Sequence, residues 1–199
     1  MTTNPTSRPF RASTEGAVVA ARPPRLMTLA EFRRRYSNRE DGFKYEFNKG
    51  IIEKTQNKMR ITQYHIVKNL TRHFVKTEAY KNGSELAIEV EQLTGREQVR
   101  RPDLCLVPAQ KLKAKDETIS GFAIEITSPT DRLEDIQRKR REYFRAGVQV
   151  VWQIDPTDQS VSVYTSPVDV KICEGAAVCS AAPALPDFEM TAEQIFQEP

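Results

Sequence analysis

The sequence lacks any apolar run close to the roughly 20 residues that a membrane-spanning helix requires. Its N-terminal stretch contains arginine and proline and lacks the apolar segment of a secretory signal. These two absences predict a cytoplasmic protein with no membrane partner. The chain has 199 residues, of which 39% are hydrophobic and 29% charged, so it is long enough to form one domain with a proper core.

Cysteine and histidine are also scarce. The three cysteines, Cys105, Cys173 and Cys179, have spacings that match no zinc pattern. The two histidines, His65 and His73, are too far apart for the i, i+4 spacing of a helical metal pair. We therefore expect reduced structural thiols and no histidine-rich metal site.

The charge is only mildly basic, with a net value of +3 and a sequence pI of about 8.7. This balance permits nucleic-acid binding but does not require it. The sequence contains no recognisable helix-turn-helix or zinc finger that would read bases. Phosphate contacts would therefore come from local clusters of basic side chains.

Composition divides the chain into an arm and a domain. Residues 1–25 contain several prolines, serines and threonines and four arginines against the single acidic residue Glu15. Such a segment buries too little apolar area to offset the entropy of ordering, so we predict a disordered arm. Contact between this arm and an acidic partner is the alternative. Residues 26–199 are expected to form a single domain.

Hydrophobic periodicity and turn residues define the expected elements of this domain. Thr28 and Glu31 form a capping-box pattern, and the Asn-Lys-Gly turn at 48–50 indicates a hairpin. The order of helices and strands predicts an α/β fold with a mixed sheet. The expected helices are 28–36, 59–80, 131–146 and 191–196; the expected strands are 43–47, 51–54, 85–92, 99–107, 122–127, 148–154 and 160–165, with a charged loop around 111–115 and edge strands or loops over 166–188.

Two carboxylates interrupt apolar runs. Asp103 lies in P-D-L-C-L-V and Glu125 in F-A-I-E-I-T, both in segments expected to be buried strands. An unpaired charge there would cost several kcal/mol, so something must compensate it. The two carboxylates could share Mg²⁺, or each could pair with a cation such as Arg101 or Lys139. Lys139 could instead pair with Asp135, four residues before it on the same helix.

An ordered series of motifs resembles the Uma2 family of restriction-endonuclease-like proteins, within the PD-(D/E)XK nuclease superfamily. The resemblance extends from Met27 to Phe196. The motifs that match the family pattern in order are Y-E-F-N-K-G at 45–50, a histidine at 65, R-P-D-L at 101–104, E-I-T-S-P-T-D at 125–131, Lys139 and Tyr143 as K-x-x-x-Y, A-G-V at 146–148, and D-P at 155–156.

This resemblance implies a restriction-endonuclease-like core, with a twisted mixed sheet flanked by helices. It implies that Asp103 and Glu125 bind Mg²⁺ or Mn²⁺. The usual lysine of E-x-K is Thr127 here, so the resemblance places that function on Lys139 of the following helix. Glu46 would be the further acidic residue, catalytic and reaching the metal directly or through water.

The implied activity is metal-dependent hydrolysis of phosphodiester bonds in nucleic acid, with DNA as the expected substrate and a homodimer as the expected assembly. His65 and Arg101 are expected to bind phosphate or to be structural. The apolar stretches 176–178 and 181–185 could form a dimer contact or complete the core. The alternative function is a catalytically silent module that binds nucleic acid or protein, such as an accessory protein of a mobile element or defence system.

Overall fold

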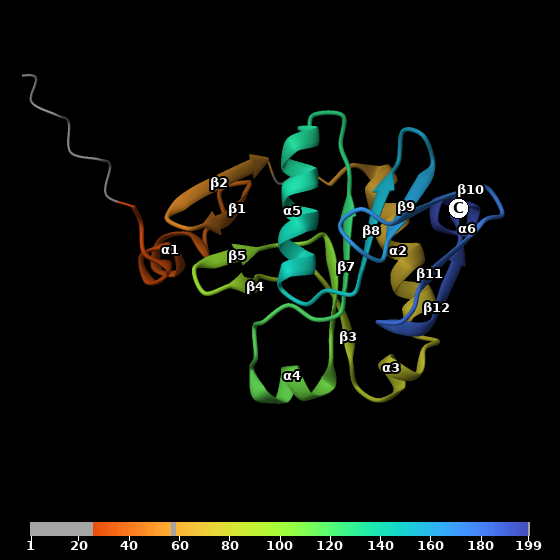
Figure 1. The fold of residues 1–199 in the computed structure, drawn as a ribbon, viewed down its shortest axis with the longest axis horizontal. Coiled ribbons are helices and arrows are strands. Elements are labelled where there is room, and N and C mark those ends of the chain that lie inside the picture. The colour runs from red at the N-terminus through yellow and green to blue at the C-terminus, as the bar shows by residue number, and fades with distance from the viewer. Residues whose placement is uncertain (1–25, 57–58, 199) are drawn as a thin grey trace, which may run out of the picture.

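The computed structural model describes residues 26–56 and 59–198 (Figure 1). The predicted disordered arm, residues 1–25, lies outside the described residues. The helices are α1 (Leu29–Tyr36), α2 (Ile61–Phe74), α3 (Glu78–Lys81), α4 (Ala109–Ala114), α5 (Leu133–Arg145) and α6 (Ala192–Phe196). The strands are β1 (Phe43–Asn48), β2 (Ile51–Gln56), β3 (Glu85–Ile88), β4 (Gln92–Gly95), β5 (Gln98–Arg100), β6 (Leu104–Val107), β7 (Phe122–Ile126), β8 (Val150–Asp155), β9 (Ser160–Tyr164), β10 (Val170–Glu174), β11 (Val178–Ala181) and β12 (Leu185–Thr191).

A four-stranded antiparallel sheet forms the N-terminal side, with strand order β2-β1-β5-β4. The predicted capping box is present, because Glu31 N donates to the Thr28 hydroxyl at 3.2 Å and Thr28 N donates to the Glu31 carboxylate at 3.0 Å. Helix α1 packs on this sheet through Phe32, whose ring stacks on that of Phe47 at 5.2 Å between centroids. The sheet therefore has a small core of its own.

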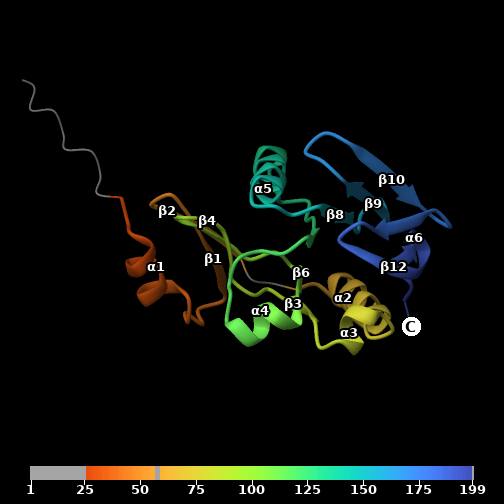
Figure 2. The same ribbon diagram turned by 60° about the horizontal axis from the view of Figure 1, so that its bottom comes forward.

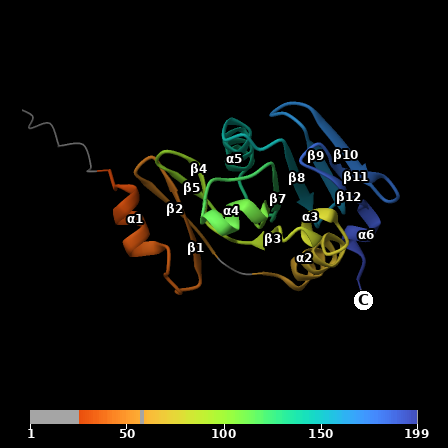
Figure 3. The ribbon, with the colours of Figure 1, turned by 90° about the horizontal axis from the view of Figure 1, so that it is seen from below.

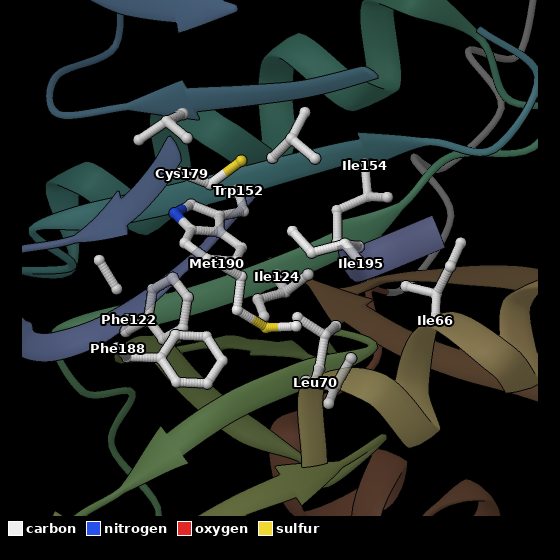
Figure 4. Packing of buried hydrophobic residues seen from close by; sticks show 14 of the residues in the cluster. Ile66, Leu70, Phe122, Ile124, Trp152, Ile154, Cys179, Phe188, Met190 and Ile195 are labelled. Atoms are coloured by element: carbon white, nitrogen blue, oxygen red, sulfur yellow. The ribbon is translucent and has the colours of Figure 1, made fainter. Parts of the chain in front are cut away.

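A six-stranded sheet with order β10-β9-β8-β7-β6-β3 forms the larger part of the protein. It is mixed, because β7 and β8 run parallel while its other neighbours run antiparallel. One face packs on α2, α6 and the β11–β12 ribbon around Trp152, Phe122 and Phe188 (Figure 4). The mixed sheet predicted from the sequence is thus present, with the smaller sheet beside it.

Helix α5 covers the opposite face of the six-stranded sheet. Ala123 and Val151 point to this face and pack with Tyr143 of α5, whereas Ile124 and Trp152 point to the main core. Figure 2 shows α5 between the β1–β2 hairpin on one side and β9–β10 on the other. Figure 3 shows α1 and α6 at opposite ends of the molecule. The seam between the two sheets therefore lies beneath α5.

The predicted helix over 59–80 is wrong in extent. It is two helices, α2 and α3, because the Thr77 hydroxyl accepts a hydrogen bond from Tyr80 N at 3.2 Å and caps a new helix. Ile66, Leu70 and Phe74 form the predicted buried stripe, but Met59 precedes α2 and its side chain is exposed. The segment expected to be a charged loop contains the short helix α4.

Two predicted strands are also divided. The segment 85–92 leaves the six-stranded sheet at Glu89, whose φ of 50° is left-handed, so β3 and β4 belong to different sheets. The segment 99–107 breaks at 101–103, where Pro102 and Asp103 separate β5 from β6. Asp103 therefore lies at the entrance to a strand and not within one.

The C-terminal apolar stretch completes the core. Ala181 and Leu185 are buried in the main cluster, and Ala177 packs against it. The three cysteines are free and buried. No helix in the described part of the chain is long and apolar enough to cross a membrane.

Candidate active site

The carboxylates of Asp103 and Glu125 face the same cavity. Strand β6 pairs with β7 in a register of Leu104 opposite Ile124, and one further residue along each strand brings Asp103 opposite Glu125. Both residues line a cavity of about 830 Å³, together with Lys139 of α5. The condition that a shared metal would impose, two carboxylates on one sheet face, is therefore met.

Asp103 is held by one lysine and one backbone amide. Its Oδ1 accepts a hydrogen bond from Lys44 Nζ at 3.0 Å, and its Oδ2 accepts one from Ile126 N at 2.7 Å. The suggested pairing with Arg101 is wrong. The Arg101 guanidinium donates to the Glu89 carbonyl oxygen at 3.0 Å and lies 3.8 Å from the Glu89 carboxylate. Its role, structural or in binding phosphate, stays a prediction.

Glu125 has a different environment, because no cation of the described residues lies within ion-pair distance of it. The Tyr143 hydroxyl donates a hydrogen bond to its Oε1. Burial raises the pKa of Glu125, and repulsion by Asp103 and Glu46 adds to this, against the opposing effect of Lys139 and Lys44. The negative charge of the Glu125 carboxylate is therefore not compensated by an ion pair within the described part of the chain.

Lys139 reaches the site from α5, where its Nζ lies 2.8 Å from Glu46 Oε2. The alternative pairing of Lys139 with Asp135 is wrong, since Asp135 pairs with Arg138 at 2.7 Å. Burial acts to lower the pKa of Lys139, but the nearby carboxylates of Glu46 and Glu125 raise it overall. The ammonium is thus charged and directed into the cavity.

Glu46 has three partners, two side-chain cations and one backbone amide. Its Oε2 contacts Lys139 and, at 3.3 Å, Arg100, while its Oε1 accepts a hydrogen bond from Arg101 N at 2.8 Å. Burial acts to raise the pKa of Glu46, but Lys139, Lys44 and Arg100 lower it to about 2. Through its contact with Lys139, Glu46 positions the lysine ammonium in the cavity. Its role as a further metal ligand, directly or through water, stays a prediction.

A network of buried ion pairs surrounds these residues. Arg100 is fully buried and contacts Glu53 at 2.8 Å and Glu142 at 2.6 Å, and Arg138 contacts Glu53 at 2.6 Å. Apart from the half-exposed Asp135, the network holds five carboxylates and four cations, which leaves one excess negative charge. The members of this charged network are Glu46, Glu53, Asp103, Glu125 and Glu142, with Lys44, Arg100, Arg138 and Lys139.

Sequence reasoning missed Lys44, and it named Tyr143 as part of the K-x-x-x-Y motif without giving it a role at the site. The signal for Lys44 is its position two residues before Glu46 in F-K-Y-E-F, because alternate residues of a strand share one face. The predicted residue His65 does not line the cavity; its Nδ1 is buried with no hydrogen-bond partner among the described residues. The structure therefore brings together Asp103, Glu125, Lys139 and Glu46, and leaves His65 outside.

The pair of Asp103 and Glu125 fits a hard divalent cation. Carboxylate oxygens are preferred ligands of Mg²⁺, which commonly takes one or two carboxylates and keeps several waters. The excess negative charge of the network and the raised pKa of Glu125 both favour a cation at this position. In the described part of the chain, no three His, Cys, Asp or Glu side chains cluster closely enough to enclose a metal.

The chain is similar to a solved structure and to a protein-family model. The chain is similar to the crystal structure of a putative nuclease belonging to DUF820 from Anabaena variabilis, with a TM-score of 0.70 and 17% sequence identity. The match covers 85% of this chain and 97% of that chain, so the two share a fold. No curated protein matches the chain. A family model described as "Uma2: Putative restriction endonuclease" matches residues 29–193, and the chain therefore belongs to the Uma2 family.

Proposed function

We propose that this protein hydrolyses phosphodiester bonds of nucleic acid with the help of a divalent metal ion. Membership of a family described as restriction endonucleases supports this reaction class. The observation that carries the proposal is the cavity in which Asp103, just before β6, and Glu125, opposite it on β7, meet the ammonium of Lys139.

Asp103 and Glu125 would hold Mg²⁺ or Mn²⁺. A bound ion of this kind lowers the pKa of a coordinated water and neutralises charge on the phosphate. Lys139 contributes a positive charge that stabilises the negative charge developing on the phosphate oxygens. Glu46 keeps the Lys139 ammonium directed into the cavity through their 2.8 Å ion pair. Tyr143 fixes one oxygen of Glu125 by its hydrogen bond.

The charge balance of the network supports a phosphodiester as the ligand. The network has more carboxylates than cations, as counted above. A divalent cation would offset this excess of negative charge. It would also favour the approach of a phosphodiester, which is an anion. Buried charge is least costly when it is compensated in this way, so metal and substrate suit the cavity together better than either does alone.

DNA as the substrate, a homodimer and a cytoplasmic location are further parts of the proposal. They rest on the family resemblance and on the absence of targeting signals noted in the sequence. Nucleases that act as dimers can place one site on each strand of a duplex. A sedimentation measurement would test the assembly independently of cleavage, and a protein that cleaves both strands as a monomer would contradict it.

The test compares cleavage by the wild type, Asp103→Asn and Lys139→Met on plasmid DNA and on DNA and RNA oligonucleotides. We expect cleavage by the wild type with Mg²⁺ or Mn²⁺ and none in EDTA. Each variant should lose at least about 100-fold in rate, because each removes a charge that acts in the transition state. Asp158→Asn is the matched control, since Asp158 is exposed and does not line the cavity.

Equal cleavage by Asp103→Asn and the wild type would show that the activity arises elsewhere. If the wild type binds nucleic acid but cleaves none of it, the second candidate function holds. In that case the protein is a silent binding module on a nuclease fold, and the internal pairing of Asp103 with Lys44 is the observation that favours it.

A further inference from the structure

Lys44 is buried against Asp103, although the proposed reaction assigns it no role. Its side chain is only 9% exposed, and its Nζ lies 3.0 Å from Asp103 Oδ1. Burying a lysine is costly unless carboxylates surround it. Lys139, the other lysine of the cavity, is paired with Glu46 instead. Each lysine of the cavity therefore pairs with a different carboxylate. Lys139 pairs with Glu46, and Lys44 pairs with Asp103, which lies opposite Glu125.

Carboxylates and one other lysine surround Lys44. Its ammonium lies 3.0 Å from Asp103 Oδ1, and Glu125, Glu46 and Lys139 line the same cavity. Lys44 and Glu46 also share one face of β1, because they are two residues apart in a strand. The ammonium of Lys44 therefore compensates the carboxylate pair in the way that a cation would.

We propose that Lys44 is the resident cation of the Asp103–Glu125 pair, and that its ammonium competes with the divalent metal ion for these carboxylate oxygens. This inference rests on the proposed function, because it concerns the metal that the proposal places at the pair. Lys44 keeps the site stable without metal and weakens metal binding. For Asp103 Oδ1 to bind the ion, Lys44 must release it.

The test measures Mn²⁺ binding by calorimetry without nucleic acid, so cleavage does not enter the result. We expect Lys44→Met to bind Mn²⁺ at least about tenfold more tightly than the wild type, because a unit positive charge near the ion is removed. Lys54→Met is the matched control. Lys54 lines the same cavity, but its Nζ lies 3.5 Å from the centre of the Phe43 ring and pairs with no carboxylate among the described residues. The affinity of Lys54→Met for Mn²⁺ should stay within about twofold of that of the wild type, as expected when a more distant charge is removed.

Thermal unfolding gives a second measurement. In EDTA, Lys44→Met and the more conservative Lys44→Gln should unfold at lower temperature than the wild type, because Asp103 loses its cation. Saturating Mn²⁺ should raise their unfolding temperatures more than that of the wild type, since tighter binding to the folded state gives a larger stabilisation. Lys44→Arg keeps the charge and should bind Mn²⁺ as weakly as the wild type.

Three results would overturn the inference. Equal or weaker Mn²⁺ binding by both neutral variants would exclude competition while leaving the proposed metal site intact. Neutral variants that stay unfolded even with Mn²⁺ would show that the ion cannot replace Lys44. If no chain binds Mn²⁺, the inference fails together with the proposed metal dependence.

Discussion

The substitution Arg100→Met tests whether the charged network stabilises the fold. Arg100 is 0% exposed, and its guanidinium contacts three glutamates from three separate elements. Glu46 lies on β1, Glu53 on β2 and Glu142 on α5. Methionine has a similar length but no charge, so the change leaves these carboxylates without the cation that joins them.

The structure allows the magnitude to be estimated. Removing one partner of a buried ion pair typically costs about 3–5 kcal/mol, because the remaining charge is left uncompensated. A folded domain is usually stable by about 5–15 kcal/mol, so this loss would be a large share of the total. At about 2–4 °C for each kcal/mol in a chain of this size, the unfolding temperature should fall by about 6–20 °C.

The assays are urea unfolding for the free energy and thermal unfolding for the midpoint temperature, both at neutral pH in EDTA and followed by circular dichroism and tryptophan fluorescence. Arg138→Met is the control, because Arg138 pairs with Glu53 but its side chain is 32% exposed. Water screens such a pair, and the expected loss is only about 1 kcal/mol. If Arg100→Met loses no more stability than Arg138→Met, the reasoning from burial is refuted.

Two further predictions concern pH and salt. In EDTA the free energy of unfolding should reach its maximum on the acidic side of neutrality, as measured by urea titrations between pH 3 and pH 8. The pKa values of Glu46 and Glu53 are lowered to about 2, so the stability that they contribute is present above their unfolded pKa of 4.5 and is lost as the pH falls from there towards 2. The pKa of Glu125 is raised, so the ionised Glu125 side chain destabilises the folded state above its folded pKa. This destabilisation disappears as the pH falls through that value. A free energy of unfolding that stays constant down to pH 3 would contradict both shifts. Affinity for DNA, measured with Asp103→Asn to prevent cleavage, should fall steeply as salt increases, because phosphate contacts release counterions; a flat titration would count against nucleic acid as the partner.

Local signals in the sequence predicted the elements that depend on near neighbours. The capping box of Thr28 and Glu31 and the hairpin of β1 and β2 are both present, because each is encoded within a few residues. The ends of helices within one long periodic segment could not be predicted from neighbouring residues. The apolar period of α2 has no visible interruption before Thr77, and only the hydrogen bonds of the folded chain show that Thr77 caps another helix.

The candidate site also combines features that local sequence predicts with features that depend on distant parts of the chain. Asp103 and Glu125 were recognisable because a charge within an apolar run needs compensation. The identity of the compensating groups was not, because Lys44 meets Asp103 across 59 residues of sequence. The burial of Lys44 and Glu46 depends on α5 covering the seam between the two sheets. The pattern F-K-Y-E-F alone is equally typical of a strand with one solvated face.

The pairing of β1 with α5 also determines when the site can form during protein synthesis. Lys44 and Glu46 are synthesised well before Lys139 and Tyr143, which follow them in the sequence. Chains are made from the N-terminus at a few residues per second, so Glu46 waits for its lysine partner until α5 has left the ribosome. A partly synthesised chain therefore has the first acidic residues of the network without the helix that completes the cavity. The cavity to which the proposed function is assigned therefore cannot form before α5 has been synthesised and has folded against β1.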